Sequence, residues 1–215
     1  MDHGTGCLIC SSAADALTLE SGKKYSFCPE CEFISIDKRF RISEKEARLR
    51  YLRHNNSSSN KGYVDMLRGL AGYITEHMPG EGRCVLDFGC GPVPVLGEIL
   101  ESKGFTVSIF DPLFFSNDDF TGKEYDAVIL NEVIEHLESP HAVLSDLKRL
   151  LAPGGCFVFS SLLHSGSEDD FRNWWYKEDV THISFFSERT VDVLARRIKM
   201  KKLHCDGRSR WVYVR

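Results

Sequence analysis

The chain has 215 residues, of which 42% are hydrophobic and 27% charged, with a formal net charge of −4. These values suit one globular domain of ordinary size with a small appendage, and the slightly acidic balance argues against a general nucleic-acid binder. No apolar run is long enough to span a membrane, and the first residues lack the basic and apolar regions of a signal peptide. We therefore expect a cytoplasmic protein, without a membrane partner, whose eight cysteines are thiols or metal ligands.

Residues 1–36 are short, cysteine-bearing and poor in helical periodicity. Cys7 and Cys10 form one C-x-x-C pair, Cys28 and Cys31 form a second, and 17 residues separate the two pairs. This spacing is typical of a two-knuckle zinc site, in which four thiolates complete a closed tetrahedron. We expect a zinc ribbon whose structural zinc supplies much of the folding free energy. The alternative is a set of unligated thiols or a redox pair.

Residues 37–80 are predicted to form a helical linker or cap, with two helices around a polar loop at residues 54–60. The second helix carries one apolar face, and it ends at Pro79-Gly80. The residues of that face are Tyr63, Met66, Leu67, Leu70, Ile74 and Met78. Residues 36–54 hold seven Lys or Arg against three acids, and residues 196–210 hold seven against Asp206 alone. We interpret both basic stretches as solvated faces.

Strands and helices alternate through the remainder of the chain, residues 81–215. Strands are predicted at residues 84–88, 106–110, 125–130 and 156–160, and helices after residue 94, from Ser139 to Leu151 and at residues 187–198. Two short strands, at residues 202–205 and 211–214, complete the chain. This pattern predicts an α/β fold: a Rossmann-like, doubly wound, mostly parallel sheet. Only 14 positions separate Asp111 from Tyr125, so we expect one strand to be missing.

The candidate cofactor site follows the first of these strands. Gly89-Cys90-Gly91 lies between a strand and a helix, where glycines allow a tight turn and a close approach by a ligand. Asp111 ends the next strand, 20 residues after Gly91, where a nucleotide-binding fold places the acid that holds ribose hydroxyls. A dinucleotide fingerprint needs glycine where this chain has Pro94. S-adenosylmethionine (SAM) has no pyrophosphate, and its cationic amine suits Asp87.

Five segments together resemble the class I SAM-dependent methyltransferases. They are residues 85–91, Asp111, residues 125–128, residues 132–137 and residues 151–155. Their order is most similar to the ubiquinone-pathway O-methyltransferase-like group, and within it to bacterial members with an N-terminal zinc ribbon.

The resemblance implies a role for each matched position. The methionine part of SAM would be surrounded by Asp87, Gly89, Cys90 and Gly91, and its ribose would be held by Asp111. The adenine would contact Pro112 and Leu113. The sulfonium side would be lined by Asn131, Glu132 and Val133. The sequence departs from the family at Val93, where a third glycine is usual, and a side chain there narrows the approach to SAM.

Two histidines are candidates for the general base that a hydroxyl acceptor would need. His136 follows the end of the third strand, and His182 closes the aromatic stretch Trp174–His182, which we expect to form a lid above the carboxyl edge of the sheet. Asp179 could orient His182, and Trp175 or Tyr176 could wall the acceptor cavity. Tyr63 could close the site from the N-terminal side. The alternative for each histidine is a hydrogen-bonded structural role.

The favoured function is the transfer of a methyl group from SAM to a small or medium-sized molecule, at oxygen. A second hypothesis is an RNA- or protein-directed methyltransferase that docks a nucleic acid or protein acceptor through the zinc ribbon. A third is a weakly catalytic SAM-binding module.

Overall fold

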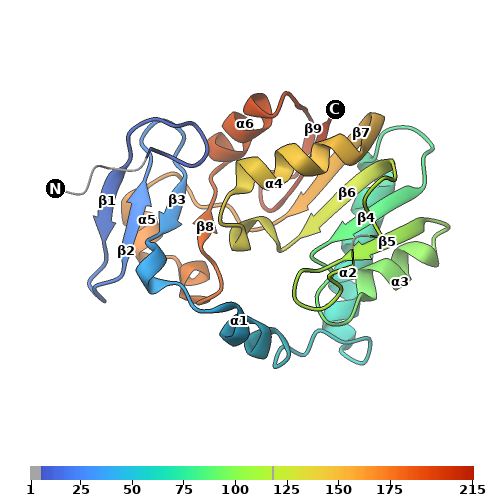
Figure 1. Cartoon of the computed structure of the whole chain (residues 1–215), viewed down its shortest axis with the longest axis horizontal. Coiled ribbons are helices and arrows are strands. Elements are labelled where there is room, and N and C mark those ends of the chain that lie inside the picture. Colours follow the sequence, from blue (N-terminus) through green and yellow to red (C-terminus); the bar gives the residue numbers. More distant parts are fainter. Residues whose placement is uncertain (1–5, 118) are drawn as a thin grey trace.

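A computed structural model describes residues 6–117 and 119–215, and it contains two β-sheets joined through helices (Figure 1). Residues 1–5 of the predicted zinc module and Asp118 lie outside the described residues. Among the helices in the described part, none is both long and apolar enough to cross a membrane.

The larger sheet has six strands in the order β5-β4-β6-β7-β10-β9. Their bounds are β4 Cys84–Phe88, β5 Thr106–Phe110, β6 Tyr125–Asn131, β7 Leu151–Ser160, β9 Lys201–Cys205 and β10 Arg210–Val214. Strands β5, β4, β6 and β7 are parallel, whereas β10 runs antiparallel to β7 and to β9. The expected mostly parallel sheet is confirmed. So is the missing strand, because the described residues between β5 and β6 form only an isolated bridge between Asp111 and Phe115.

Strand β7 begins earlier than predicted. It starts at Leu151, where the predicted helix from Ser139 ends, and runs through Pro153-Gly154-Gly155 before it reaches the predicted start at residue 156. The pairing with β6 shifts register between Tyr125 and Ala127, and Gly154 has a φ of 79°. Glycine adopts this left-handed conformation without strain, so β7 continues through the register shift instead of ending there.

Helices cover both faces of this sheet because successive strand residues point to opposite sides. Helices α2 (Lys61–His77) and α3 (Val95–Glu101) pack on the face that includes Val85 and Ala127. Helices α4 (Pro140–Leu147) and α6 (Glu188–Arg197) pack on the face that includes Leu86 and Val128. The apolar stripe predicted for α2 faces the core through Leu67, Leu70 and Ile74, which are buried. The prediction that Met66 belongs to that stripe is wrong, because Met66 is 47% exposed.

The smaller sheet has the order β1-β2-β3-β8 and combines both ends of the chain. Its strands are β1 Asp15–Thr18, β2 Lys24–Phe27, β3 Ile34–Ile36 and β8 Ser184–Phe185. β8 pairs with β3 through Ile34 opposite Phe185, and α5 (Glu168–Asn173) packs Phe171 edge-on against Tyr25, with ring centroids 5.2 Å apart. The N-terminal ribbon is therefore completed by a strand from the C-terminal half.

Helix α1 (Glu44–Tyr51) connects this ribbon to α2 and contains no buried residue. Its first turn is fixed by a capping box between Ser43 and Glu46. In Figure 1 it lies beyond the ends of β4, β5 and β6, between the two sheets. Polar contacts rather than apolar burial hold it there.

Candidate functional site

The glycine loop after β4 requires glycine at its first position. Gly89 and Gly91 have φ angles of 84° and 71°, and a Cβ added to Gly89 would lie 2.5 Å from Cγ2 of Val133. The backbone N–H of Gly89 donates to the carbonyl of Phe110, at 2.7 Å. Val93 does not take up the left-handed conformation, and its side chain is 37% exposed. The backbone of this loop therefore needs no third glycine.

Asp111 is buried at the end of β5, and its carboxylate organises the backbone around it. Oδ2 accepts the N–H of Gly91 at 2.9 Å, while Oδ1 accepts the N–H groups of Leu113 at 2.9 Å and Phe114 at 3.2 Å. These bonds fix the turn that contains Pro112. A carboxylate has about four acceptor positions, so one position remains for a ligand.

Asp87, the next-to-last residue of β4, is 3% exposed, and no donor among the described residues reaches its carboxylate. Burial, together with the negative charge of Asp111, raises the pKa of Asp87 to about 7. Tyr63, in the first turn of α2, lies close enough that Asp87 and Cys90 add to the effect of burial and raise its pKa to about 12. A buried carboxylate without a donor fits the cationic amine of SAM, and Asp111 fits its ribose.

The end of β6 brings two carboxylates onto one phenol. Tyr176 donates to Oε2 of Glu132 at 2.8 Å, and the same hydroxyl lies 2.5 Å from Oε1 of Glu135. Burial raises the pKa of both acids, that of Glu132 to about 8. Glu132 also has a φ of 52°, a conformation that is costly for a residue other than glycine. Asn131 pairs with Ser160 of β7, and Val133 lies against the glycine loop.

The structure brings His136 and His182 together, with ring centroids 4.9 Å apart. Nδ1 of His136 lies 2.9 Å from the carbonyl oxygen of Thr181 and 3.1 Å from the hydroxyl of Tyr51. Nδ1 of His182 lies 2.8 Å from the carbonyl oxygen of Tyr176. Burial lowers the pKa of both, that of His182 to about 4, so both rings are neutral near pH 7.

The structure contradicts one expectation for the aromatic segment. Asp179 does not orient His182, because its carboxylate accepts two bonds from Arg50, at 3.0 and 2.9 Å, and two more from Thr181. Of the two aromatic residues expected to wall an acceptor cavity, Trp175 is 69% exposed, whereas Tyr176 is buried, with its ring centroid 4.1 Å from that of His182. The segment packs instead against the ribbon, where Tyr176 and Ile183 share a core with Leu17 and Ile34.

Sequence reasoning missed three residues at this site, namely Arg50, Tyr51 and Glu135. The sequence does carry a signal that Glu135 belongs to the site, because it is an acid next to the apolar pair Val133-Ile134, directly after a buried strand. The sequence carries no such signal for Arg50 and Tyr51, because α1 has no apolar periodicity that would indicate a packing partner.

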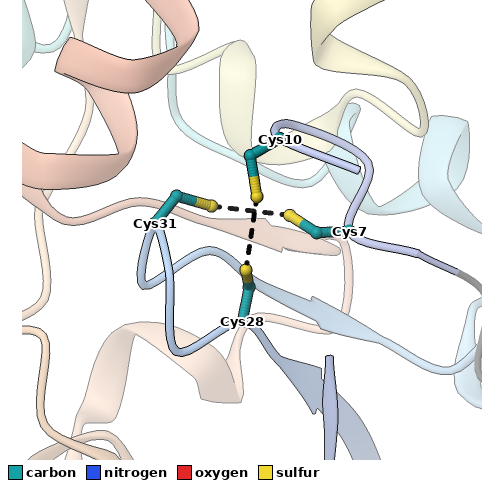
Figure 2. A group of neighbouring side chains, drawn as sticks. All are labelled: Cys7, Cys10, Cys28 and Cys31. Carbon is teal, nitrogen blue, oxygen red and sulfur yellow. Dashed lines mark hydrogen bonds between the residues drawn. The ribbon is translucent and has the colours of Figure 1, made fainter. Parts of the chain in front are cut away.

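The four N-terminal cysteines point their sulfurs at one another (Figure 2). Sγ of Cys7 lies 3.4 Å from that of Cys31, and Sγ of Cys10 lies 3.5 Å from that of Cys28. A tetrahedral site with zinc–sulfur bonds of about 2.3 Å has sulfurs about 3.8 Å apart, so these four thiols could hold zinc.

Each cysteine pair is followed by a backbone turn of the same type. Ser11 and Glu32, each directly after the second cysteine of a pair, have φ angles of 68° and 62°. The N–H of Ser11 donates to the carbonyl of Cys7, and that of Glu32 to the carbonyl of Cys28. The repeated turn aims both pairs at one point.

Known proteins share this architecture. A family described as a methyltransferase domain matches residues 48–201. The ubiquinone biosynthesis O-methyltransferase of Salmonella typhimurium is 32% identical over 120 residues, a match that covers 44% of this chain and 49% of the relative. The chain thus spans about half the length of the curated relatives it matches.

Solved structures with low sequence identity show the same fold. An O-methyltransferase family protein from Burkholderia thailandensis has a TM-score of 0.52 and 15% identity, over 82% of this chain and 61% of that one. A chain from the complex between the Haloferax volcanii Trm112 methyltransferase activator and a methyltransferase has a TM-score of 0.54 and 16% identity, over 79% and 97%. The family match takes in the glycine loop, Asp111 and β6, and the chain therefore belongs to the family of proteins that share this methyltransferase domain.

Proposed function

We propose that this protein transfers a methyl group from SAM to a small or medium-sized acceptor, at an oxygen atom. The observation that carries the proposal is the pair of buried carboxylates at the ends of adjacent strands, Asp87 on β4 and Asp111 after β5, on either side of a glycine loop. One carboxylate lacks a donor and the other keeps one acceptor position. SAM offers a cationic amine to the first and a ribose hydroxyl to the second.

In this arrangement the residues after β6 would lie on the methyl side of SAM. Val133 contacts the glycine loop, and Glu132, Tyr176 and the two histidines follow outward from it. Bound SAM would supply an electrophilic methyl on a sulfonium. The chain would bind the acceptor, orient its oxygen and exclude water from the reaction.

The choice of oxygen rests on two supports. The matched curated relatives are named as O-methyltransferases. In addition, each histidine ring keeps Nε2 free for an acceptor hydroxyl, because Nδ1 is engaged with a backbone carbonyl. A neutral imidazole nitrogen can accept the proton of a hydroxyl.

Calorimetry with SAM and with its demethylated product, S-adenosylhomocysteine, tests the first half of the proposal. We expect one saturable site per chain for each compound and none for NAD. The second half is tested by measuring S-adenosylhomocysteine production with phenols, catechols and aliphatic alcohols, alongside amines of matched size. Absence of SAM binding would refute the proposal, and turnover only with amines would refute the choice of oxygen.

A further inference from the structure

Three side chains with metal-ligand chemistry converge beyond the end of β6. Glu135 and His136 lie in the 3₁₀ helix Ile134–His136, and His182 precedes β8. One potential ligand atom of each lies within 4.8 Å of those of the other two. None of the three belongs to the cysteine site of the ribbon, so they form a second cluster.

Both histidines present a lone pair on the same ring atom. A backbone carbonyl oxygen only accepts hydrogen bonds, so the Nδ1 atoms that lie 2.9 Å from Thr181 O and 2.8 Å from Tyr176 O must carry the proton. Nε2 of each neutral ring is then unprotonated, and it bonds no other described residue. Metal-binding histidines show this same arrangement, with the second ring nitrogen donating to a carbonyl that fixes the tautomer.

Glu135 supplies a carboxylate of which only one oxygen has a hydrogen-bond partner among the described residues. The residue is fully buried; Oε1 is bonded to Tyr176, but Oε2 has no partner among the described residues. A buried carboxylate oxygen without a donor is costly, and Glu132 brings a second buried carboxylate to the same phenol. The cation on the facing helix, Arg50, is already paired with Asp179. Among the described residues, this region therefore holds two carboxyl groups and no cation paired with them.

We propose that Glu135, His136 and His182 bind a divalent transition-metal cation. Two imidazole nitrogens and one carboxylate favour ions from Mn²⁺ to Zn²⁺ over Mg²⁺ or Ca²⁺, which prefer oxygen ligands. Three ligands of an ion with bonds of about 2.1 Å lie about 3.0–3.4 Å apart, so side chains whose ligand atoms lie within 4.8 Å of one another must move closer together to bind it. The ion would satisfy Oε2 of Glu135 and offset the charge of the two carboxylates.

Three protein ligands leave positions open on the ion, and this gives the site a role that rests on the proposed function. With the ion bound, both Nε2 atoms would be ligands and could not take up the acceptor's proton. An acceptor hydroxyl bound to the ion would instead have a lowered pKa and would lose its proton to water. Its oxygen would then form the bond to the methyl carbon while the carbon–sulfur bond breaks and the electron pair stays on sulfur. Binding of the cation itself does not depend on this reaction.

The test is a titration of the full chain, with its zinc content first brought to one per chain, by Mn²⁺. Free Mn²⁺ is followed by electron paramagnetic resonance. We expect one bound Mn²⁺ per chain, competed by Zn²⁺, and a loss of affinity of at least about tenfold in Glu135→Gln and in His182→Ala. His141→Ala, which alters a histidine on α4 outside the cluster, should bind Mn²⁺ like the unmodified protein.

Two outcomes overturn the proposal: no saturable Mn²⁺ or Co²⁺ site besides the cysteines, or unchanged affinity in Glu135→Gln. Glu135→Gln keeps the shape of the side chain, so it remains a valid test even if His182→Ala does not fold. SAM affinity is measured on each variant. Loss of Mn²⁺ binding with intact SAM affinity supports the metal site, whereas Mn²⁺ binding by a protein that never binds SAM refutes only the proposed function.

Discussion

The carboxylate of Asp111 accepts a hydrogen bond from the backbone N–H of Gly91 at 2.9 Å, and this bond joins the end of β5 to the glycine loop that follows β4. The two residues are 20 positions apart and follow adjacent parallel strands. Asp111 therefore has two tasks in the proposed function: it shapes the loop and holds the ribose.

Replacing Asp111 should weaken SAM binding for both reasons. We expect Asp111→Ala to reduce the binding free energy by roughly 1.5–3 kcal/mol, the range for a hydrogen bond to a charged group, as measured by calorimetry. Asp126→Ala is the matched control, because Asp126 accepts the N–H of Cys84 at 2.8 Å near the opposite edge of the sheet. That variant should lose stability but keep its SAM affinity. Equal affinity in Asp111→Ala and the unmodified protein would reject the assignment.

The raised pKa of Asp87 predicts a pH dependence. Its pKa in the folded protein is about 7, above the ordinary value of 3.8, so the folded state holds the proton more tightly than the unfolded state. Without SAM, this residue's contribution to stability is fully present below about pH 4 and is lost as the pH rises through about 7. The cationic amine needs the ionised carboxylate, so SAM affinity should rise by roughly five- to tenfold between pH 6 and pH 8.

Asp87→Asn is the control for this pH effect. It keeps the shape of the side chain but cannot ionise, so the variant should bind SAM weakly and with a flat profile across the same range. A profile equally steep in Asp87→Asn would assign the dependence to another group.

The four cysteines should hold one zinc per chain, released by a mercurial reagent and detected with a colorimetric chelator. We expect Cys31→Ser to lack this zinc and Cys205→Ser to retain it. Because structural zinc supplies much of the folding free energy of so small a module, its removal should first expose the amides of β3 and β8 to hydrogen exchange. SAM affinity should fall only later. Protein prepared without chelator that contains no thiol-bound zinc would contradict the assignment.

The Arg50–Asp179 pair should couple α1 to the segment before β8. Their side chains are 41% and 23% exposed, so a double-mutant cycle with Arg50→Gln and Asp179→Asn should give a coupling of about 0.5–1 kcal/mol in urea unfolding. The exposed pair Arg149–Asp146 on and after α4 should show no measurable coupling. Under the proposed function, Arg50→Gln should raise the KM for the acceptor more than the Kd for SAM. A larger change in the Kd for SAM than in the KM for the acceptor would indicate that α1 contributes to SAM binding and not to acceptor binding.

The sequence alone determined the sheet that carries the glycine loop. Strands such as residues 84–88 are buried on both faces, so their apolar runs and the glycines that follow are visible without any tertiary information. The short interval between Asp111 and Tyr125 likewise predicted the missing strand, because too few residues remain for a helix and a strand. The cysteine spacing predicted the approach of four thiols for an equally local reason: each C-x-x-C turn fixes two sulfurs by its own backbone.

Only the tertiary structure decided how the acceptor side is built. β8 is two residues long and pairs with β3 about 150 positions earlier, a contact that no periodicity encodes. That pairing places the segment before β8 against the ribbon, which exposes Trp175, buries Tyr176 and turns both Nδ1 atoms toward backbone carbonyls. The partner of Asp179 was equally hidden, because an ion pair between a polar helix and a distant loop depends on where the two segments meet in space.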